Sequence, residues 1–367
     1  MTVRSQPYMV NMGPQHPSTH GVLRLRLTLD GETILDAEPV LGYLHSSKEK
    51  LFETHTYLQC VPVTDRMDYL ASMTNNLGIC MAIEKLAGIP VPDRGSYIRV
   101  IVSELQRLAS HCFAQGVFLQ DLGAWGSPLM YFLREREQIL DMFEMVCGAR
   151  LTYNYIRPGG VSQDIPPQFV PAVHSFLETF PAKLDEYEEL LWKNEILRAR
   201  TVGIGVVSRE LAVSAAFSGP MLRASGVQWD LRKADPYCGF ENYDFDVPVG
   251  QTGDCFDRFM VRFYEMRESL KIVRQALDVL PPGDWRAQVP IVIRPPAGEA
   301  FTMIESPRGM LGYYLVSDGG ANPWRFHVRA PSFINLGALN EMLVGTTMAD
   351  VVAIVGSIDI VMGEVDR

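Results

Sequence analysis

The 367-residue sequence lacks the features of membrane-spanning, secreted and self-contained metal proteins. It contains no uncharged apolar run of about 18 residues, so no segment is predicted to span a bilayer by itself. The N-terminal Met1 to Pro7 has none of the apolar character of a secretory signal. The six cysteines are scattered and form no Cys-x-x-Cys pair, which argues against disulfides and against a zinc or iron–sulfur site within the chain. We therefore expect a reduced, cytosolic protein.

Positive charge is also scarce. The formal net charge is −10, which makes nucleic-acid binding an unfavourable interpretation. No Ser/His/Asp order and no His-Glu-x-x-His motif supports hydrolysis, and the glycine-rich stretches lack the strand–turn–helix setting of a phosphate loop. With 47% apolar and 21% charged residues, the chain can nevertheless bury a large core.

One uncharged stretch stands out near the N-terminus. Asn11 to Gly21 holds two glycines, two prolines and two histidines, which is typical of an ordered loop. The loop leads into Val22–Leu29, where leucines alternate with polar residues, and Asp30-Gly31 turns the chain into Thr33–Val40. This pattern predicts a β-hairpin that holds a histidine-bearing loop. The loop histidines could equally do no more than satisfy backbone groups.

The middle of the chain has helical periodicity. Apolar residues at helical spacing predict a bundle of about five long helices rather than a doubly wound sheet. Ser127 is a candidate cap for the third of these helices, Pro128 suits its first position and Gly148 suits the position after its end. The predicted helices cover Arg66–Leu86, Tyr97–Phe118, Pro128–Cys147, Pro167–Trp192 and Phe256–Leu280.

The flanking segments are less regular. A short helix is expected from Ser47 to Leu58, an extended segment from Cys60 to Thr64 around Pro62, and an apolar helix from Met348 to Ser357. After Pro281 the sequence is β-like and proline-rich, and Leu311–Ser317 with Trp324–Arg329 predicts a second hairpin. We therefore predict an α+β fold, with residues 1–50 a loop and hairpin region, 51–280 a helical bundle, and 281–367 a β-rich segment and tail.

Some polar residues lie in apolar surroundings. Asp65 is a plausible helix cap with Tyr69 one turn further on, and Asp121 falls at the end of a predicted helix. His20, Tyr69 and Asp121 could form a relay in which tyrosine and histidine donate protons to a carbonyl and the acid re-protonates the histidine. Read singly, Tyr69 could be a core residue and Asp121 a loop acid. Arg134 to Glu137 is most simply a solvated surface.

Several longer motifs resemble those of one family, the 49-kDa-type (D) subunit of respiratory complex I, which is itself akin to the large subunit of [NiFe] hydrogenases. The resemblance extends from about Tyr8 to Arg367. The motifs are Met12–Gly21, Gly42–His45, Thr64–Tyr69, Arg134–Glu137, Arg157–Gly160, Leu222–Gly226, Asp230–Lys233, Glu265–Lys271, Val328–Phe333 and Glu364–Arg367.

The resemblance implies a [NiFe]-hydrogenase large-subunit-like fold and a subunit that holds a quinone headgroup. It places His20 and Tyr69 on the two carbonyls of the quinone, Asp121 beside the histidine, and Met73 and Val361 in the cavity wall. The chain would hold no cofactor, and electrons would come from a [4Fe–4S] cluster on a small partner subunit. Further implied partners are a 30-kDa-type peripheral subunit, a ferredoxin-like two-cluster subunit and membrane subunits, on the cytoplasmic side of an energy-converting membrane.

Two departures from the family pattern concern the partner's cluster. Ser46 stands where relatives usually have arginine, and Thr152 where many have histidine, while Arg66 is retained. Loss of a cation and of an imidazole near the cluster should lower its reduction potential. We therefore expect a low-potential quinone, such as menaquinone or plastoquinone. A high and strongly pH-dependent potential in a redox titration would contradict this hypothesis.

Two further departures concern the fold and the alternatives to it. The segment from Leu280 to Glu305 is shorter than in many relatives. Val361 and Glu364 stand where a hydrogenase needs nickel-binding thiolates, so a hydrogenase catalytic subunit is disfavoured. A purely architectural subunit remains an alternative, and NADH or ferredoxin could equally be the electron donor.

Overall fold

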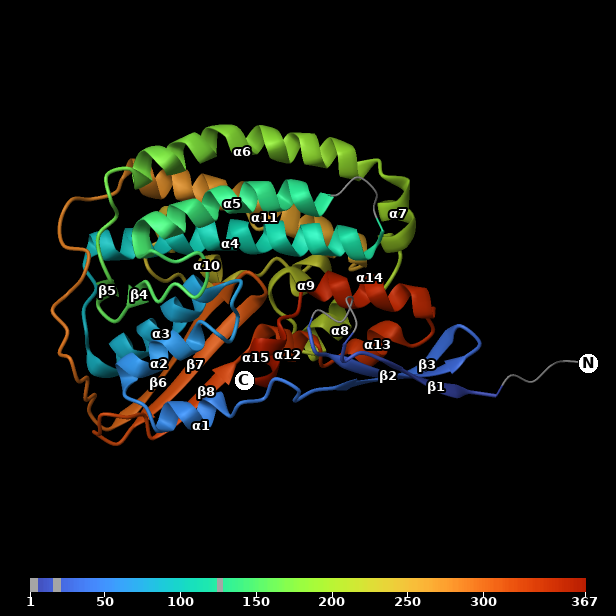
Figure 1. Ribbon diagram of the computed structural model, residues 1–367, viewed down its shortest axis with the longest axis horizontal. Coiled ribbons are helices and arrows are strands. Elements are labelled where there is room, and N and C mark those ends of the chain that lie inside the picture. Colours follow the sequence, from blue (N-terminus) through green and yellow to red (C-terminus); the bar gives the residue numbers. More distant parts are fainter. Residues whose placement is uncertain (1–5, 16–20, 124–127) are drawn as a thin grey trace, which may run out of the picture.

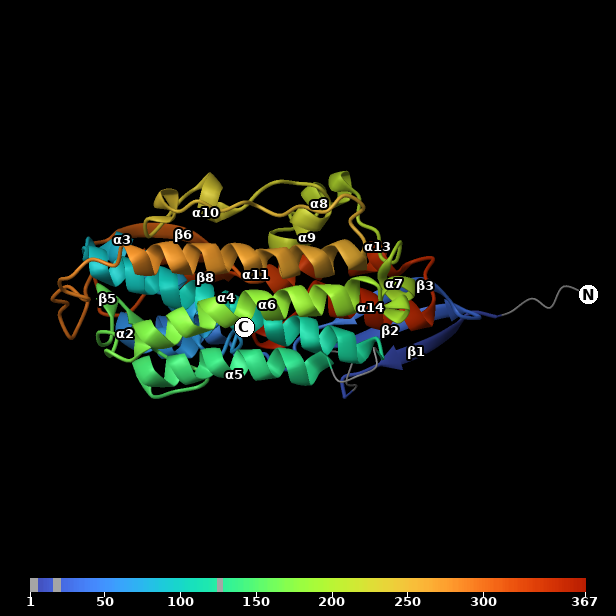
Figure 2. The same cartoon turned by 90° about the horizontal axis from the view of Figure 1, so that it is seen from above.

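The computed structural model describes residues 6–15, 21–123 and 128–367. It has the mixed architecture that the sequence predicts: most of the long helices form one layer, and two three-stranded antiparallel sheets lie beneath it (Figure 1). A further, two-stranded sheet consists of β4 and β5. Both views place β1–β3 towards one end of the molecule and β6–β8 nearer the other (Figures 1 and 2). No helix among the described residues is both long and apolar enough to cross a bilayer.

The N-terminal sheet has the order β1 (Tyr8–Met12), β2 (Arg24–Asp30), β3 (Thr33–Val40), and all its pairings are antiparallel. The predicted hairpin is confirmed as β2–β3, with Gly31 at φ 62° in its turn. Asn11, predicted as the start of a loop, lies in β1. The alternating leucines of β2 bury one face of that strand, and the free edge of β2 pairs with the segment that contains Asn11.

The long helices are α3 (Ser72–Ala87), α4 (Asp93–Asp121), α5 (Pro128–Cys147), α6 (Phe169–Trp192) and α11 (Cys255–Asp278). These confirm the five predicted helices to within four residues at each end, except that α3 begins at Ser72, six residues after the predicted Arg66. Helix α4 packs against both α5 and α11, and seen from above it lies between them (Figure 2); most of its residues from Ile98 to Leu119 are buried. A helix that is buried on all sides must carry its polar residues in pairs.

The C-terminal sheet is β6 (Gly298–Ser306), β7 (Gly309–Ser317) and β8 (Arg325–Arg329). The predicted second hairpin is confirmed as β7–β8, and β6 adds an edge strand. Helix α3 lies across β6 and β7, where a Cβ at Gly78 would come within 2.7 Å of the Tyr313 ring. Gly78 therefore permits this close packing of helix on sheet.

The short elements connect these layers. Backbone hydrogen bonds tie the N-terminal sheet to the C-terminal segment, because Ile34 N donates to Thr346 O and Met348 N donates to Glu32 O. The predicted helix from Met348 is confirmed as α14. The short elements are α1 (Lys48–Glu53), α2 (Tyr57–Thr64), β4 (Ile156–Arg157), β5 (Gly160–Val161), α7 (Glu195–Thr201), α8 (Arg209–Ser214), α9 (Gly219–Ala224), α10 (Leu231–Ala234), η2 (Phe240–Asn242), α12 (Pro331–Asn335), α13 (Leu339–Leu343), α14 (Met348–Ile358) and α15 (Met362–Asp366).

Three local predictions between Ser47 and Asp65 are wrong. The segment predicted to be extended around Pro62 is helical, because the side chains of Thr56 and Gln59 form a capping box that starts α2. The predicted helix Ser47–Leu58 is accordingly divided between α1 and α2. Asp65 does not cap α3: it is the C-cap of α2, and α3 begins only after Ala71.

The motif Arg134 to Glu137 on α5 is only partly a solvated surface, contrary to prediction. Glu135 and Arg136 are buried. Glu135 accepts hydrogen bonds from Tyr187 Oη at 3.0 Å and from Gln138 at 2.7 Å, and α6 covers it. Neighbouring charges in one motif therefore face opposite sides of the helix.

Candidate functional site

Tyr69 lies in a tight turn between α2 and α3. Its side chain is 40% exposed, whereas Asp68 and Leu70 on either side are buried, so Tyr69 is not the core residue that one interpretation allowed. The turn is held by backbone hydrogen bonds from Met67 N to Thr64 O and from Ala71 N to Asp68 O. Among the residues that the structure describes, none forms a hydrogen bond with the Tyr69 hydroxyl. The phenol is thus presented by a rigid backbone.

A buried ion cluster lies behind this turn. Arg308, in the β6–β7 turn, donates from Nη1 to Asp68 Oδ2 at 2.6 Å and lies 3.4 Å from Asp359 Oδ1. Burial raises the pKa of Tyr69, and the positive charge of Arg308 opposes that rise. At neutral pH Tyr69 is therefore a neutral hydrogen-bond donor close to a buried cation.

The C-terminal tail packs directly on the Tyr69 turn. A Cβ at Gly363 would lie 2.6 Å from Met67 O and 2.9 Å from Arg66 O, so only glycine permits this approach. On the other side of the tail, a Cβ at Gly21 would lie 3.6 Å from Met362 Cγ. The Tyr69 turn, the tail and Gly21, which lies three residues before the start of β2, therefore meet at one place.

The other predicted wall residues are enclosed. Met73 on α3 is fully buried and Val361, just before α15, is 2% exposed. Their positions beside the Tyr69 turn fit a wall, but in this chain their side chains lie within the core. His20 lies outside the described residues, and Asp121, the last residue of α4, is half-buried. The meeting of His20, Tyr69 and Asp121 therefore stays a prediction.

The three residues expected near a partner's cluster fall in two places. Arg66 is exposed, and Thr152, half-buried at φ 53°, is in the loop whose Asn154 backbone donates to Asp65. Burial raises the pKa of Asp65 to about 7, against the hydrogen bond from Asn76. Ser46 is exposed elsewhere, beside the tail, where its backbone N lies 3.5 Å from Arg367 O.

The loop before Ser46 is held against the C-terminal tail by hydrogen bonds. The sequence did not predict this contact. The Asp366 carboxylate accepts hydrogen bonds from Gly42 N at 2.8 Å and Leu44 N at 2.7 Å, and the Asp366 carbonyl lies 2.7 Å from His45 Nδ1. A surface cavity of about 480 Å³ opens here, lined by residues that include His45, Phe333 and Arg367. The tail thus organises both the Tyr69 turn and the Ser46 loop.

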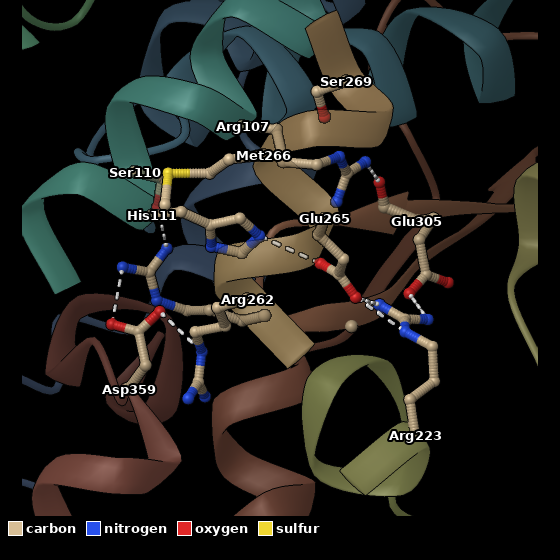
Figure 3. A network of polar contacts seen from close by, with 12 residues as sticks. Arg107, Ser110, His111, Arg223, Arg262, Glu265, Met266, Ser269, Glu305 and Asp359 are labelled. Carbon is tan, nitrogen blue, oxygen red and sulfur yellow. Dashed lines mark hydrogen bonds and ion pairs between the residues drawn. The ribbon is translucent and has the colours of Figure 1, made fainter. Parts of the chain in front are cut away.

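A second feature missed from sequence is a polar network inside the bundle (Figure 3). His111 of α4 pairs with Glu265 of α11, and Glu265 pairs with Arg223 of α9. The signal was present, because α4 repeats charged residues within an otherwise apolar helix. Among the described residues no three His, Cys, Asp or Glu side chains gather as metal ligands.

Comparison with known proteins identifies the family of this chain. The family model described as respiratory-chain NADH dehydrogenase, 49 Kd subunit, matches residues 121–296 and 287–367. A protein from Dehalococcoides mccartyi strain 195, named as the D subunit of NADH-quinone oxidoreductase, is 56% identical over 367 residues, covering 100% of both chains. Relatives of the same name from Desulforamulus reducens and Clostridium beijerinckii are 52% and 49% identical, covering 100% of this chain and 100% and 98% of theirs. The chain belongs to the family of the 49-kDa subunit of respiratory-chain NADH dehydrogenase.

Proposed function

We propose that this chain, as a subunit of an NADH:quinone oxidoreductase, forms the wall of a quinone-headgroup cavity that carries Tyr69. The observation that supports this most directly is the exposed Tyr69 phenol, which a rigid turn holds close to the buried Arg308. A neutral phenol can donate a hydrogen bond to a quinone carbonyl, and a buried cation stabilises the negative charge that forms when the quinone gains electrons.

In this proposal two electrons come from a [4Fe–4S] cluster on the small partner subunit, and two protons come through this chain. Tyr69 donates one proton from its hydroxyl and His20 donates the other, so the quinone becomes a quinol. Asp121 then returns a proton to His20. Met73 and Val361 form the apolar floor, which the partner subunit completes.

The proposal extends to the surroundings of the site. The Ser46 loop and the Arg66–Thr152 region would face the partner's cluster, and the absence of a positive charge at position 46 favours a low-potential quinone such as menaquinone or plastoquinone. Further partners would be a 30-kDa-type subunit, a two-cluster ferredoxin-like subunit and membrane subunits at the quinone entrance. The chain would be a peripheral subunit on the cytoplasmic side of the membrane.

The test is quinone reduction by membranes that carry Tyr69→Phe, with assembly checked on a native gel. This change removes one hydroxyl and hardly alters packing, so we expect an assembled complex with a severe loss of rate or quinone affinity. Tyr131→Phe, on the exposed side of α5, is the matched control and should behave as the unmodified complex. Normal turnover with Tyr69→Phe would instead favour the purely architectural role.

A further inference from the structure

Two clusters of buried charged side chains lie on either side of His111. We call the first the Arg308 cluster and the second the Arg223 cluster. The Arg308 cluster comprises Asp68, Arg262, Arg308 and Asp359, and the Arg223 cluster comprises Glu104, Arg107, Arg223, Asp230, Arg232, Glu265 and Glu305. Figure 3 shows the imidazole of His111 with Glu265 and Arg223 to one side and Arg262 and Asp359 to the other.

The contacts of His111 define its tautomer. The side chain is fully buried, and Nε2 lies 2.9 Å from Glu265 Oε2. Burial alone would raise the pKa of Glu265, but the guanidinium of Arg223, whose Nε donates at 2.7 Å, holds it well below its usual range. Glu265 is therefore a carboxylate, and His111 must donate from Nε2–H. Its Nδ1 then carries a lone pair, and no described residue forms a hydrogen bond with it.

The surroundings keep His111 neutral at rest. Burial lowers its pKa, Glu265 opposes this, and Arg107 and Arg262 add to the lowering. Further charges on this side belong to Arg308 and Asp359, which pair with each other. Arg308 Nη1 lies 3.3 Å from the hydroxyl of Ser110, the residue before His111. An unpaired buried nitrogen is costly, so its presence calls for an explanation.

The charge balance of the two clusters suggests an explanation for the unpaired Nδ1 of His111. Together they hold five arginines and six carboxyl groups, and burial raises the pKa of two of these carboxyls, Asp68 and Glu305, so the buried positive and negative charges are close to balance. Glu364 lies close by, and its pKa is raised to about 7, first by burial and then by Asp68. Because the buried charges are close to balance, further negative charge near Tyr69 would favour a proton on His111.

A continuous path joins His111 to the Tyr69 turn. Asp68 precedes Tyr69 in the chain and binds Arg308, and Arg308 contacts Ser110, the residue before His111. We propose that His111 is a positioning residue for quinone reduction, whose Nδ1 takes up one proton from water when negative charge develops beside Tyr69. The step forms one N–H bond, moves no electron and reverses when the quinol leaves. This inference rests on the proposed function.

The first test uses the assembled complex with His111→Gln. The glutamine amide can still donate to Glu265 but cannot gain a proton. We expect normal assembly, an unchanged KM for a short-chain quinone, a kcat lowered roughly two- to thirtyfold, and a pH profile of kcat that differs from that of the unmodified complex. His174→Gln, on α6 and only partly buried, is the matched control and should leave the pH profile unchanged.

The second test follows the proton itself rather than the rate. Infrared difference spectra of the unmodified complex, with ¹⁵N-labelled histidine, should show an imidazole gaining a proton when the quinone is reduced, and His111→Gln should abolish that band. An unchanged kcat and pH profile, or the absence of such a band, would overturn the role of His111. If Tyr69→Phe is inactive while His111→Gln is normal, this inference fails and the proposed function stands; if Tyr69→Phe is normal, the proposed function itself fails.

Discussion

Arg223 and Arg150 each pair with three carboxylates, but in opposite surroundings. Arg150 at the end of α5 binds Glu137, Asp141 and Glu144, and its side chain is 38% exposed. Arg223 meets Glu265, Glu305 and Asp230 where every partner is fully buried. Water can replace each partner of Arg150, whereas nothing can replace the partners of Arg223. Similar geometry therefore has very different consequences, and the proposed function depends on the buried region.

The largest effect should follow from Arg223→Met, which keeps the volume but removes the charge. Glu265 and Glu305 would be left buried without their cation, at a cost of about 3–5 kcal/mol. We expect little or no assembled complex on a native gel. Assembly at the normal level would show that the buried carboxyl groups can be protonated in place of their lost cation. Arg223 and Arg150 would then differ less than we expect.

A smaller effect, of packing rather than charge, should follow from Gly363→Ala. The added Cβ would meet the Met67 carbonyl oxygen at 2.6 Å and press the tail off the Tyr69 turn, at a cost of about 1–3 kcal/mol. The complex should unfold at lower urea concentration and lose quinone affinity. Gly298→Ala is the matched control, because no atom lies within 4 Å of its added Cβ. Equal effects of the two changes would contradict the close tail contact.

A titration effect should follow from Glu364→Gln. Because the pKa of Glu364 is raised to about 7, the folded chain holds this proton more tightly than the unfolded chain does. The resulting stability is present below the ordinary glutamate pKa of about 4.3 and is lost as pH rises towards 7. Glutamine keeps an oxygen for Ser332 N, which donates at 2.8 Å, and does not titrate. The thermal midpoint of the variant should therefore fall less between pH 5 and pH 8 than that of the unmodified complex; parallel curves would contradict the shifted pKa.

The sequence predicted the elements that have a periodic pattern, but it did not predict contacts between residues far apart in the chain. The alternation in β2–β3 and the helical spacing of α3 to α6 and α11 identified those elements within a few residues, apart from the start of α3. The same reasoning could not detect that Arg308 binds Asp68, because 240 positions separate them and neither is unusual in its own segment. It likewise placed Tyr69 inside a helix, although the Arg308–Asp68 pair holds that residue in a turn.

The candidate site shows the same difference between what local motifs predict and what only long-range contacts reveal. Tyr69 was named from its motif, and the structure places it on an exposed turn, but the importance of Arg308, Asp359 and Gly363 around it comes only from contacts between distant segments. His111 and Glu265 also fell within ordinary helical patterns. A charged residue inside a helix that is apolar on all sides was the available signal, and it indicates a buried partner without naming it.

The smallest effect should follow from Arg150→Met, which removes as many ion pairs as Arg223→Met. Because Arg150 and its three carboxylates are substantially exposed, each lost pair is replaced by water, and the cost should stay within about 1 kcal/mol. The measurement is the urea midpoint of the assembled complex at low and high salt. The difference from the unmodified complex should shrink as salt screens these charges. A large loss that does not depend on salt would mean that a partner subunit buries this end of α5, and that the exposed and the buried arginine are less different than this chain alone implies.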